Sequence, residues 1–345
     1  MPEKNIKSKL LNLRWVKSLT TATPRDRRIR IFMILLLTVV AGFFIYLAMN
    51  TPGFLTSGNA INMGQRLPMD IIVAVAQTMV IISGGIDLSV GAIVAFSGSL
   101  TAVAYCYWGI PVWVAILMGI VVGALFGYIN GVIIAKGKVP DFIATLGTMV
   151  TIRGVALILT GGLPVPSHIS ATTLKASLSP VILWIGGGTI FGKIPAPLVI
   201  AVVMVIIGWL ILNHTTLGRA ILAVGGNKEA AKISGINVES TKIKTYVISG
   251  VLSALAGIIL IGRMNNANAL MADPANLDSI AAVVIGGTGL EGGSGSVFGS
   301  LIGAGVLGIL KNMLNLHNVQ DYIQKVFTGI LIILVVAIDQ LRRRR

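Results

Sequence analysis

The chain has 345 residues, of which 55% are hydrophobic and only 11% are charged. Soluble domains carry about 25% charged residues, and so few charges cannot cover the surface of a soluble fold of this length. The composition therefore excludes an ordinary soluble protein and predicts an all-α fold, a polytopic bundle of transmembrane helices.

The net charge of +15 comes from 27 Lys and Arg residues against 12 Asp and Glu. Twenty of the basic residues fall in four groups that border apolar runs: nine within residues 1–30, then Lys136 with Lys138, five from Arg219 to Lys244, and Arg342 to Arg345. Lys and Arg mark cytoplasmic loops in this way. The sequence offers no folded basic face with readout residues, which argues against nucleic acid as a partner.

At about 20 residues per span, the apolar runs predict ten transmembrane helices. They are expected at 31–49, 67–83, 88–108, 110–135, 141–161, 195–213, 244–264, 271–288, 296–313 and 323–340. The first run is too long for the apolar region of a signal peptide, about 7–15 residues. The eighth has too short an apolar part to cross alone, so a broken or half-inserted helix is expected there.

Ten spans place both termini on the same side, in agreement with basic residues at both ends. We expect a cytoplasmic tail over 1–30, a permease domain over 31–341 and a basic cytoplasmic end over 342–345. The loop at about 214–243 is then cytoplasmic, and the segment 162–194, with few charges, lies outside.

A carboxylate stands beside flexible backbone in the segment IISGGIDLSVGAIVAFSGSL, residues 81–100, between two apolar runs. Asp87 follows Gly84 and Gly85 there, and such a group at membrane depth must be buried in protein or face water. Asp87 is interpreted either as the N-cap of the third span, the favoured alternative, or as a polar gate element. The other candidates for the transport pathway are Asp70, Asn130 and Asp278.

Small residues recur at every fourth position in two of the expected spans. The stripes are Gly119, Gly123, Gly127 and Gly131 in the fourth span, and Gly295, Gly299 and Gly303 in the ninth. Lipid provides no hydrophobic drive for helix association, so close packing through small residues has to supply it. The stripes predict tight helix packing, and whether one forms a subunit interface stays open.

The segment LSVGAIV at 88–94 can be aligned with DSIAAVV at 278–284. The two segments are five spans apart, so the halves of the chain would cross the membrane in opposite directions. Inverted repeats of this kind occur in transporters. The sequence thus indicates an inverted repeat, on seven aligned residues only.

The loop LGRAILAVGGNKEAAKISGIN, residues 217–237, contains a second distinctive pattern. Two glycines break the chain, and the next residue is suited to cap a short polar helix that ends near Gly235. Such a helix is either an ordinary solvated surface helix or a site that a motor protein grips. The candidate coupling residues are Gly225, Gly226, Asn227, Glu229, Ala230, Ala231, Ser234 and Gly235.

Several motifs are absent from the sequence. There is no G-x-x-x-x-G-K-[ST] phosphate loop, and the three histidines lack metal-ligand spacing. Neither a helical H-E-x-x-H nor a G-x-S-x-G motif occurs. We therefore expect a protein that is not an enzyme and holds no metal or cofactor.

The segments 81–100, 130–154, 217–237 and 277–304 closely resemble the ribose/xylose/galactose-type permeases of bacterial ABC importers. The resemblance covers nearly all of the chain after residue 60. It implies an inner-membrane permease, paired with a second copy or a related chain, a cytoplasmic ATPase that hydrolyses ATP, and an extracytoplasmic sugar-binding protein. It also implies that 217–237 is the coupling loop. Asn276 departs from the family, which often has an acidic residue there.

The predicted function is the transmembrane permease subunit of an ATP-driven importer for a monosaccharide. Two alternatives remain open: a permease of the same kind for branched-chain amino acids or another small polar solute, and an ion-coupled secondary transporter. For the latter, Asp70 and Asp87 are the candidate ion ligands.

Overall fold

The structure is a computed structural model that describes residues 49–167, 174–320 and 322–330, with isolated positions at 38, 42, 44–46 and 333. The chain divides into two compact units, Met1–Tyr46 and Leu47–Arg345, and the description below concerns the second. Most of the expected span at 31–49 and half of that at 323–340 lie outside the described residues, and the described part of the second, 323–330 and 333, is helical. The expected end segments 1–30 and 342–345 lie wholly outside them.

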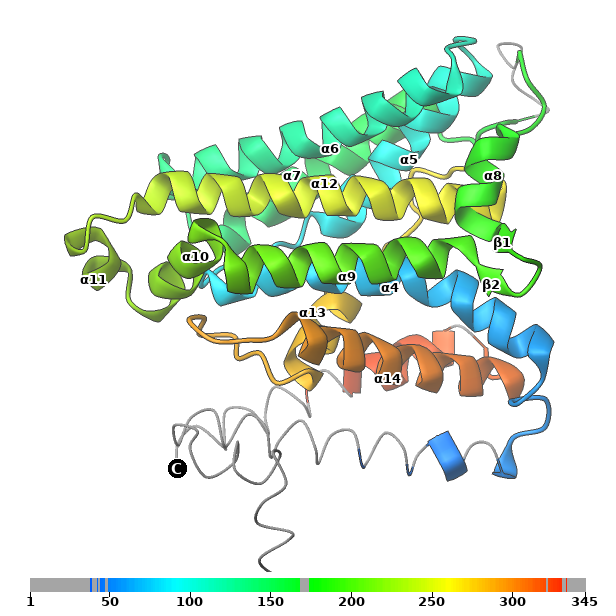
Figure 1. Cartoon of the computed structure of the whole chain (residues 1–345). Helices are drawn as coiled ribbons and strands as arrows, with labels where there is room; N and C mark the ends of the chain where they lie inside the picture. The colour runs from blue at the N-terminus through cyan, green and yellow to red at the C-terminus, as the bar shows by residue number, and fades with distance from the viewer. Residues whose placement is uncertain are drawn as a thin grey trace, which may run out of the picture. The chain divides into compact units, whose positions relative to one another are not determined.

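The described part of the second unit is almost entirely helical (Figure 1). Its long helices are α4 (Ser57–Ile82), α6 (Val112–Ala135), α7 (Asp141–Thr160), α9 (Ala196–His214), α12 (Val238–Met264) and α14 (Val297–Leu316). The shorter elements are α5 (Val90–Cys106), α8 (Pro180–Gly187), α10 (Thr216–Gly226), α11 (Lys228–Ile233), α13 (Ala275–Ile285) and the two-residue strands β1 (Thr189–Ile190) and β2 (Ile194–Pro195), which pair antiparallel.

Among the described residues, six helices are long and apolar enough to cross a membrane, namely the six long ones above. Eight of the ten expected spans coincide with a helix, and two of these eight helices, α5 and α13, are shorter than a full span. The helix α4 begins ten residues before the expected start at 67, where the hydroxyl of Thr56 accepts the Asn59 N–H at 3.3 Å. Capping overrides the polar composition of its first turns.

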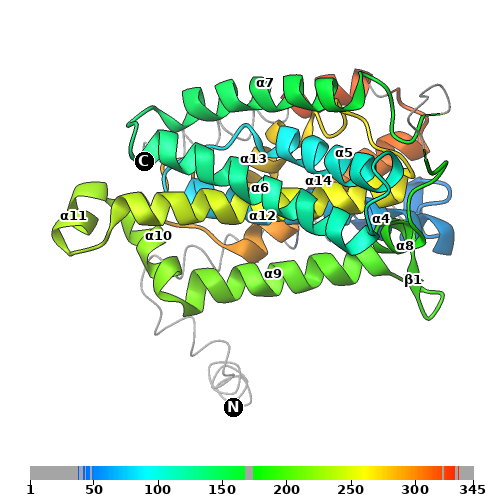
Figure 2. The same ribbon diagram turned by 90° about the horizontal axis from the view of Figure 1, so that it is seen from above.

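The helix α12 runs through the middle of the bundle in Figure 2, and α4 packs against it. Their most apolar 18-residue windows are 72% and 78% buried, against 22% in both α6 and α7 and 33% in α9. A helix that is apolar all round is buried in a core or faces lipid. The helices α6, α7 and α9 therefore provide lipid-facing surface, whereas α4 and α12 form the buried core of the bundle.

The glycine stripe of α6 packs against α12 and α5. A Cβ atom added at Gly127 would lie 2.2 Å from the Tyr246 carbonyl oxygen, and one at Gly123 would lie 2.5 Å from that of Gly250. Gly131 meets α12 in the same way, and Gly119 meets α5. The stripe is used within one chain, so it is not a subunit interface.

The stripe of α14 packs against α13. Added Cβ atoms at Gly299 and Gly303 would lie 2.2 and 1.9 Å from carbonyl oxygens of α13 and the residue that caps it. Gly295 is wrongly assigned to this stripe, because the Ser296 hydroxyl accepts the Gly299 N–H and the helix begins only at Val297. Gly295 packs instead against Thr288.

Two helices that are shorter than a full span, α5 and α13, start close together inside the bundle. The Gly91 N–H, in the first turn of α5, donates to the Asn276 side-chain oxygen of α13 at 2.8 Å. From this point α5 follows α12 toward its C-terminus, since Gly257 lies against the Val94 carbonyl, whereas α13 runs toward the start of α14. The expected short eighth span is confirmed as α13. The segments aligned in the sequence, 88–94 and 278–284, fall on these two oppositely directed helices.

Candidate functional site

Three glycine-containing segments meet at the end of the bundle that carries α10 and α11. The Ile82 carbonyl, at the end of α4, accepts the Gly293 N–H at 2.8 Å. It also lies so close to Gly225 that an added Cβ atom there would be 1.7 Å from it. Gly292 fills the space between Gly84 and Gly225. The end of α10 therefore rests directly on the backbone that follows α4.

The predicted short polar helix of the loop is confirmed as α11. Asn227 caps it, its side-chain oxygen accepting the Ala230 N–H at 2.9 Å, and the chain turns at Gly235 with φ of +81°. Ala231 is the buried residue of this helix and packs between Val224 and Val238. The outward side is formed by the other candidate coupling residues, Gly226, Asn227, Glu229, Ala230, Ser234 and Gly235, which are all exposed.

Ile233 is a residue of this loop that sequence reasoning missed. Its side chain is 87% exposed at the end of α11. The signal was available in the sequence, because Ile233 is the one large apolar residue of the helix sequence KEAAKI. An exposed apolar side chain at the tip of a polar loop is suited to contact a partner protein.

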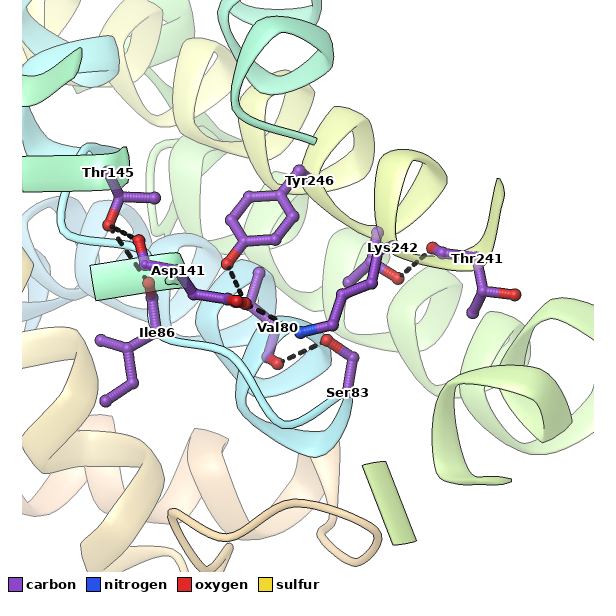
Figure 3. Close-up of polar contacts among 9 residues, drawn as sticks. Val80, Ser83, Ile86, Asp141, Thr145, Thr241, Lys242 and Tyr246 are labelled. Carbon is purple, nitrogen blue, oxygen red and sulfur yellow. Dashed lines mark hydrogen bonds and ion pairs between the residues drawn. The ribbon is translucent and has the colours of Figure 1, made fainter. Parts of the chain in front are cut away.

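A carboxylate, an ammonium and a phenol form a second group of contacts near this end (Figure 3), which we call the Asp141 cluster: Asp141, Lys242 and Tyr246. The Asp141 Oδ2 atom accepts from Lys242 Nζ and from the Tyr246 hydroxyl, at 2.8 Å each. Lys242 and Tyr246 lie one turn apart on α12, and Asp141 begins α7. All three side chains are largely covered.

A non-helical segment, residues 83–89, joins α4 to α5, and Asp87 is fully buried within it. Its carboxylate accepts the Ser89 N–H at 2.9 Å, the Ser89 hydroxyl at 2.6 Å and the Ser249 hydroxyl at 3.0 Å. The prediction of Asp87 as the N-cap is wrong, since Ser89 is the residue that precedes the first turn of α5. The carboxylate instead fixes a turn before the helix.

Asn130 of α6 joins the same group of side chains, because its amide donates to the Ser89 hydroxyl at 2.8 Å. We call Asp87, Ser89, Asn130 and Ser249 the mid-depth cluster. Ser249 lies within two residues of the middle of α12, a helix about 40 Å long at 1.5 Å per residue. Gln77 of α4, also missed from the sequence, faces the backbone N–H and C=O of Asp87 at 3.3 and 3.2 Å.

Several buried polar atoms near the mid-depth cluster have no hydrogen-bond partner among the described residues. They include the Asn130 side-chain oxygen and the hydroxyls of Ser97 and Ser253. Buried polar atoms are nearly always satisfied by protein or water. The interface of α5, α6 and α12 is thus a polar seam with unused hydrogen-bonding capacity.

The other two pathway candidates, Asp278 and Asp70, lie apart from this seam. Asp278 forms an ion pair with Lys311 of α14, and both residues line a small cavity together with Asp70 of α4. The cavity has a volume of about 10 Å³, which is about enough for one water molecule. The four predicted pathway residues thus fall in two separate places.

Comparison with known proteins gives the family. Residues 59–336 match the family model described as the permease component of branched-chain amino acid transport systems. The chain is 43% identical to the ribose import permease protein of Escherichia coli K12, over 84% of this chain and 88% of that protein. It is 39% identical to that of Haemophilus influenzae, over 91% and 93%. The xylose transport system permease protein of H. influenzae is 33% identical, over 91% and 96%.

The chain belongs to this family of ABC importer permeases. It is therefore a multi-pass membrane protein and a permease subunit. No solved structure matches it significantly.

Proposed function

We propose that the chain is the transmembrane permease subunit of an ATP-driven importer that carries a monosaccharide across the inner membrane. The observation that carries this proposal is the similarity, along most of the chain, to permeases named for ribose and xylose import. A fructose import permease protein of Rhizobium meliloti is also 38% identical over 81% of the chain. The matching family model is described by amino acid transport, so leucine is the competing cargo to test.

The partners follow from membership of this family: an ATPase on the cytoplasmic face, an extracytoplasmic sugar-binding protein and a second permease copy or a related chain. In this arrangement the loop at 214–243 faces the cytoplasm and 162–194 faces outside. The basic groups in the sequence support this orientation, with both termini cytoplasmic. ATP hydrolysis then belongs to the ATPase subunit.

The outward side of α11 is the proposed contact with the ATPase. Glu229 stands in its first turn, where a negative charge suits the helix dipole, and Ile233 supplies an apolar anchor. The contact of Gly225 with the Ile82 carbonyl then passes a movement of this loop to the segment 83–89.

The polar seam between α5, α6 and α12 is the proposed lining of the transport pathway. Its unpartnered hydroxyl and amide atoms match the hydroxyl-rich surface of a sugar. The oppositely directed helices α5 and α13 also support an inverted repeat, which places a cargo path at the repeat interface. Asp87 and Asn130, which belong to the mid-depth cluster, are then the proposed pathway residues of this seam.

The test is transport by the complex purified through a tagged permease and reconstituted in liposomes. Labelled ribose, xylose, galactose and leucine are compared with and without ATP. The proposal predicts ATP-dependent uptake of a monosaccharide. Uptake of leucine alone would move the chain to the amino acid importers, and uptake driven by an ion gradient without ATP would make it a secondary transporter. Reporter fusions after residue 25, near Ser170 and after Arg345 test the orientation.

A further inference from the structure

The Asp141 cluster has no place in the pathway or in the contact with the ATPase proposed above. Lys242 and Tyr246 are 8% and 0% exposed, and the Lys242 ammonium is paired with the Asp141 carboxylate. A buried ion pair stabilises a fold no better than apolar residues of similar volume. Its geometry therefore calls for a reason other than stability.

The Asp141 cluster lies against the non-helical segment 83–89. A Cβ atom added at Gly85 would lie 2.1 Å from Asp141 Oδ2, so the carboxylate rests directly on the backbone of the segment. The Thr145 hydroxyl, one turn further along α7, lies 2.8 Å from the Asp141 carbonyl oxygen and 3.2 Å from the Ile86 carbonyl oxygen, and it can donate its one proton to either (Figure 3). Asp141 and Thr145, near the start of α7, thus contact Gly85 and Ile86, the two residues immediately before Asp87.

The other half of the cluster is carried by the helix that follows the coupling loop. The Asn237 side chain accepts the Ser240 N–H at 2.8 Å and so starts α12 a few residues after α11 ends. Lys242 and Tyr246 lie in the first turns of α12. A displacement of α11 therefore moves both donors of the Asp141 carboxylate.

We propose that Asp141, Lys242 and Tyr246 are positioning residues that fix the segment 83–89 to the base of α12. Movement of the coupling loop is then transmitted to the mid-depth cluster. This inference rests on the proposed function, because it takes α11 as the site of ATPase contact. It adds a second route to the contact between Gly225 and Ile82. The first route reaches Ile82, immediately before the segment 83–89, and the second reaches Gly85 within it.

The experiment measures how accessible the segment 83–89 is to a thiol reagent, which reports whether the Asp141 cluster fixes it in place. The substitution Ile86→Cys is made in a protein that carries Cys106→Ser, and the purified complex is labelled with a maleimide at this single thiol. The double variant Asp141→Asn/Lys242→Met removes both charges together and so avoids an unpaired buried charge. Thr241→Val is the matched control, because its hydroxyl lies on the same turn of α12 and donates within that helix to Asn237.

The expected result is that labelling of the introduced thiol becomes about tenfold faster in the double variant and ATP-driven transport falls about tenfold, the effect of losing a charged hydrogen bond. The ATPase should co-purify as before, and Thr241→Val should match the parent. Labelling and transport equal to the control would overturn the inference. Should the double variant fail to fold, Tyr246→Phe keeps the ion pair and removes one hydrogen bond; unchanged labelling there would overturn it equally.

The proposed function is tested separately in the same preparation. Ile233→Asp alters the exposed tip of α11 and touches no part of the Asp141 cluster. Loss of the ATPase on purification is expected for Ile233→Asp alone. Retention of the ATPase by Ile233→Asp would contradict the proposed contact, whereas the labelling rate of the introduced thiol would still report on the positioning residues.

Discussion

Gly225 at the end of α10 lies directly against the carbonyl oxygen of Ile82 at the end of α4, with no room for a side chain between them. The two residues are separated by more than 140 positions in the sequence, and each ends a helix. The Gly293 N–H donates a hydrogen bond to the same oxygen, so a third segment of the chain joins the contact. This junction brings the proposed coupling loop into contact with the segment that leads to Asp87.

Gly225→Ala is expected to separate α10 from α4. The added methyl group would stand 1.7 Å from a backbone oxygen, and such overpacking costs about 1–3 kcal/mol. Gly226→Ala is the matched control, because its nearest neighbour would be 3.9 Å away and its effect should stay within about 0.5 kcal/mol. Thermal unfolding in detergent measures the difference. Equal behaviour of the two variants would contradict the tight junction.

Gly123→Leu is expected to prevent assembly of the bundle. An added Cβ atom would already lie 2.5 Å from the Gly250 carbonyl and 2.6 Å from the Ala254 side chain, so a leucine forces α6 away from α12. Gly147→Leu on α7 is the control, since nothing lies within 4 Å of a Cβ atom there. The amount of monodisperse protein after purification is the readout, and normal recovery of Gly123→Leu would refute the packing.

Lys311→Met is expected to destabilise the protein by about 3–5 kcal/mol, because it leaves the buried Asp278 carboxylate without its cation. Adding Asp278→Asn to this variant should recover most of the loss, since removal of both partners of a buried pair is often nearly neutral. Thermal unfolding of the two variants checks this. A double variant as unstable as Lys311→Met would mean that the pair does not account for the loss.

Ser249→Ala is expected to weaken transport while leaving the amount of protein unchanged. It removes one of the three hydrogen bonds that the buried Asp87 carboxylate accepts, about 1.5–3 kcal/mol for a bond to a charged group. Thr160→Val serves as the control, because the buried Thr160 hydroxyl donates within α7 to the Ala156 carbonyl oxygen. Uptake by proteoliposomes should fall about tenfold or more for Ser249→Ala only. Similar uptake by both variants would argue against a role for the mid-depth cluster.

The sequence was sufficient for features that depend on local spacing. The glycines of α6 recur at every fourth position, and Asn227 stands before a polar run, so the packing face and the capped helix followed from the pattern alone. Asp87 shows the limit of this reasoning. Its glycine-rich neighbourhood suggested a helix cap, but its acceptors are used by Ser89 and by a serine 162 positions away.

Lys242 shows why the remainder was not predictable. Composition placed it in a basic group of a solvated loop, whereas the long helix α12 carries it inward to meet Asp141, 101 positions earlier. Charge counting cannot distinguish an exposed lysine from one that a helix turns toward the interior. Asp278 and Lys311 were also both visible in the sequence, but their pairing depends on the close packing of α13 on α14.

The shortness of α13 has a consequence for how the chain enters the bilayer. With 11 residues at 1.5 Å each, α13 reaches only about half of a 30 Å hydrocarbon core, and it carries the acidic Asp278. Such a segment cannot partition into lipid during synthesis until its surroundings exist. Lys311 follows 33 residues later on α14, whose glycine face receives α13. We therefore expect the two helices to insert together as a hairpin in which Lys311 neutralises Asp278.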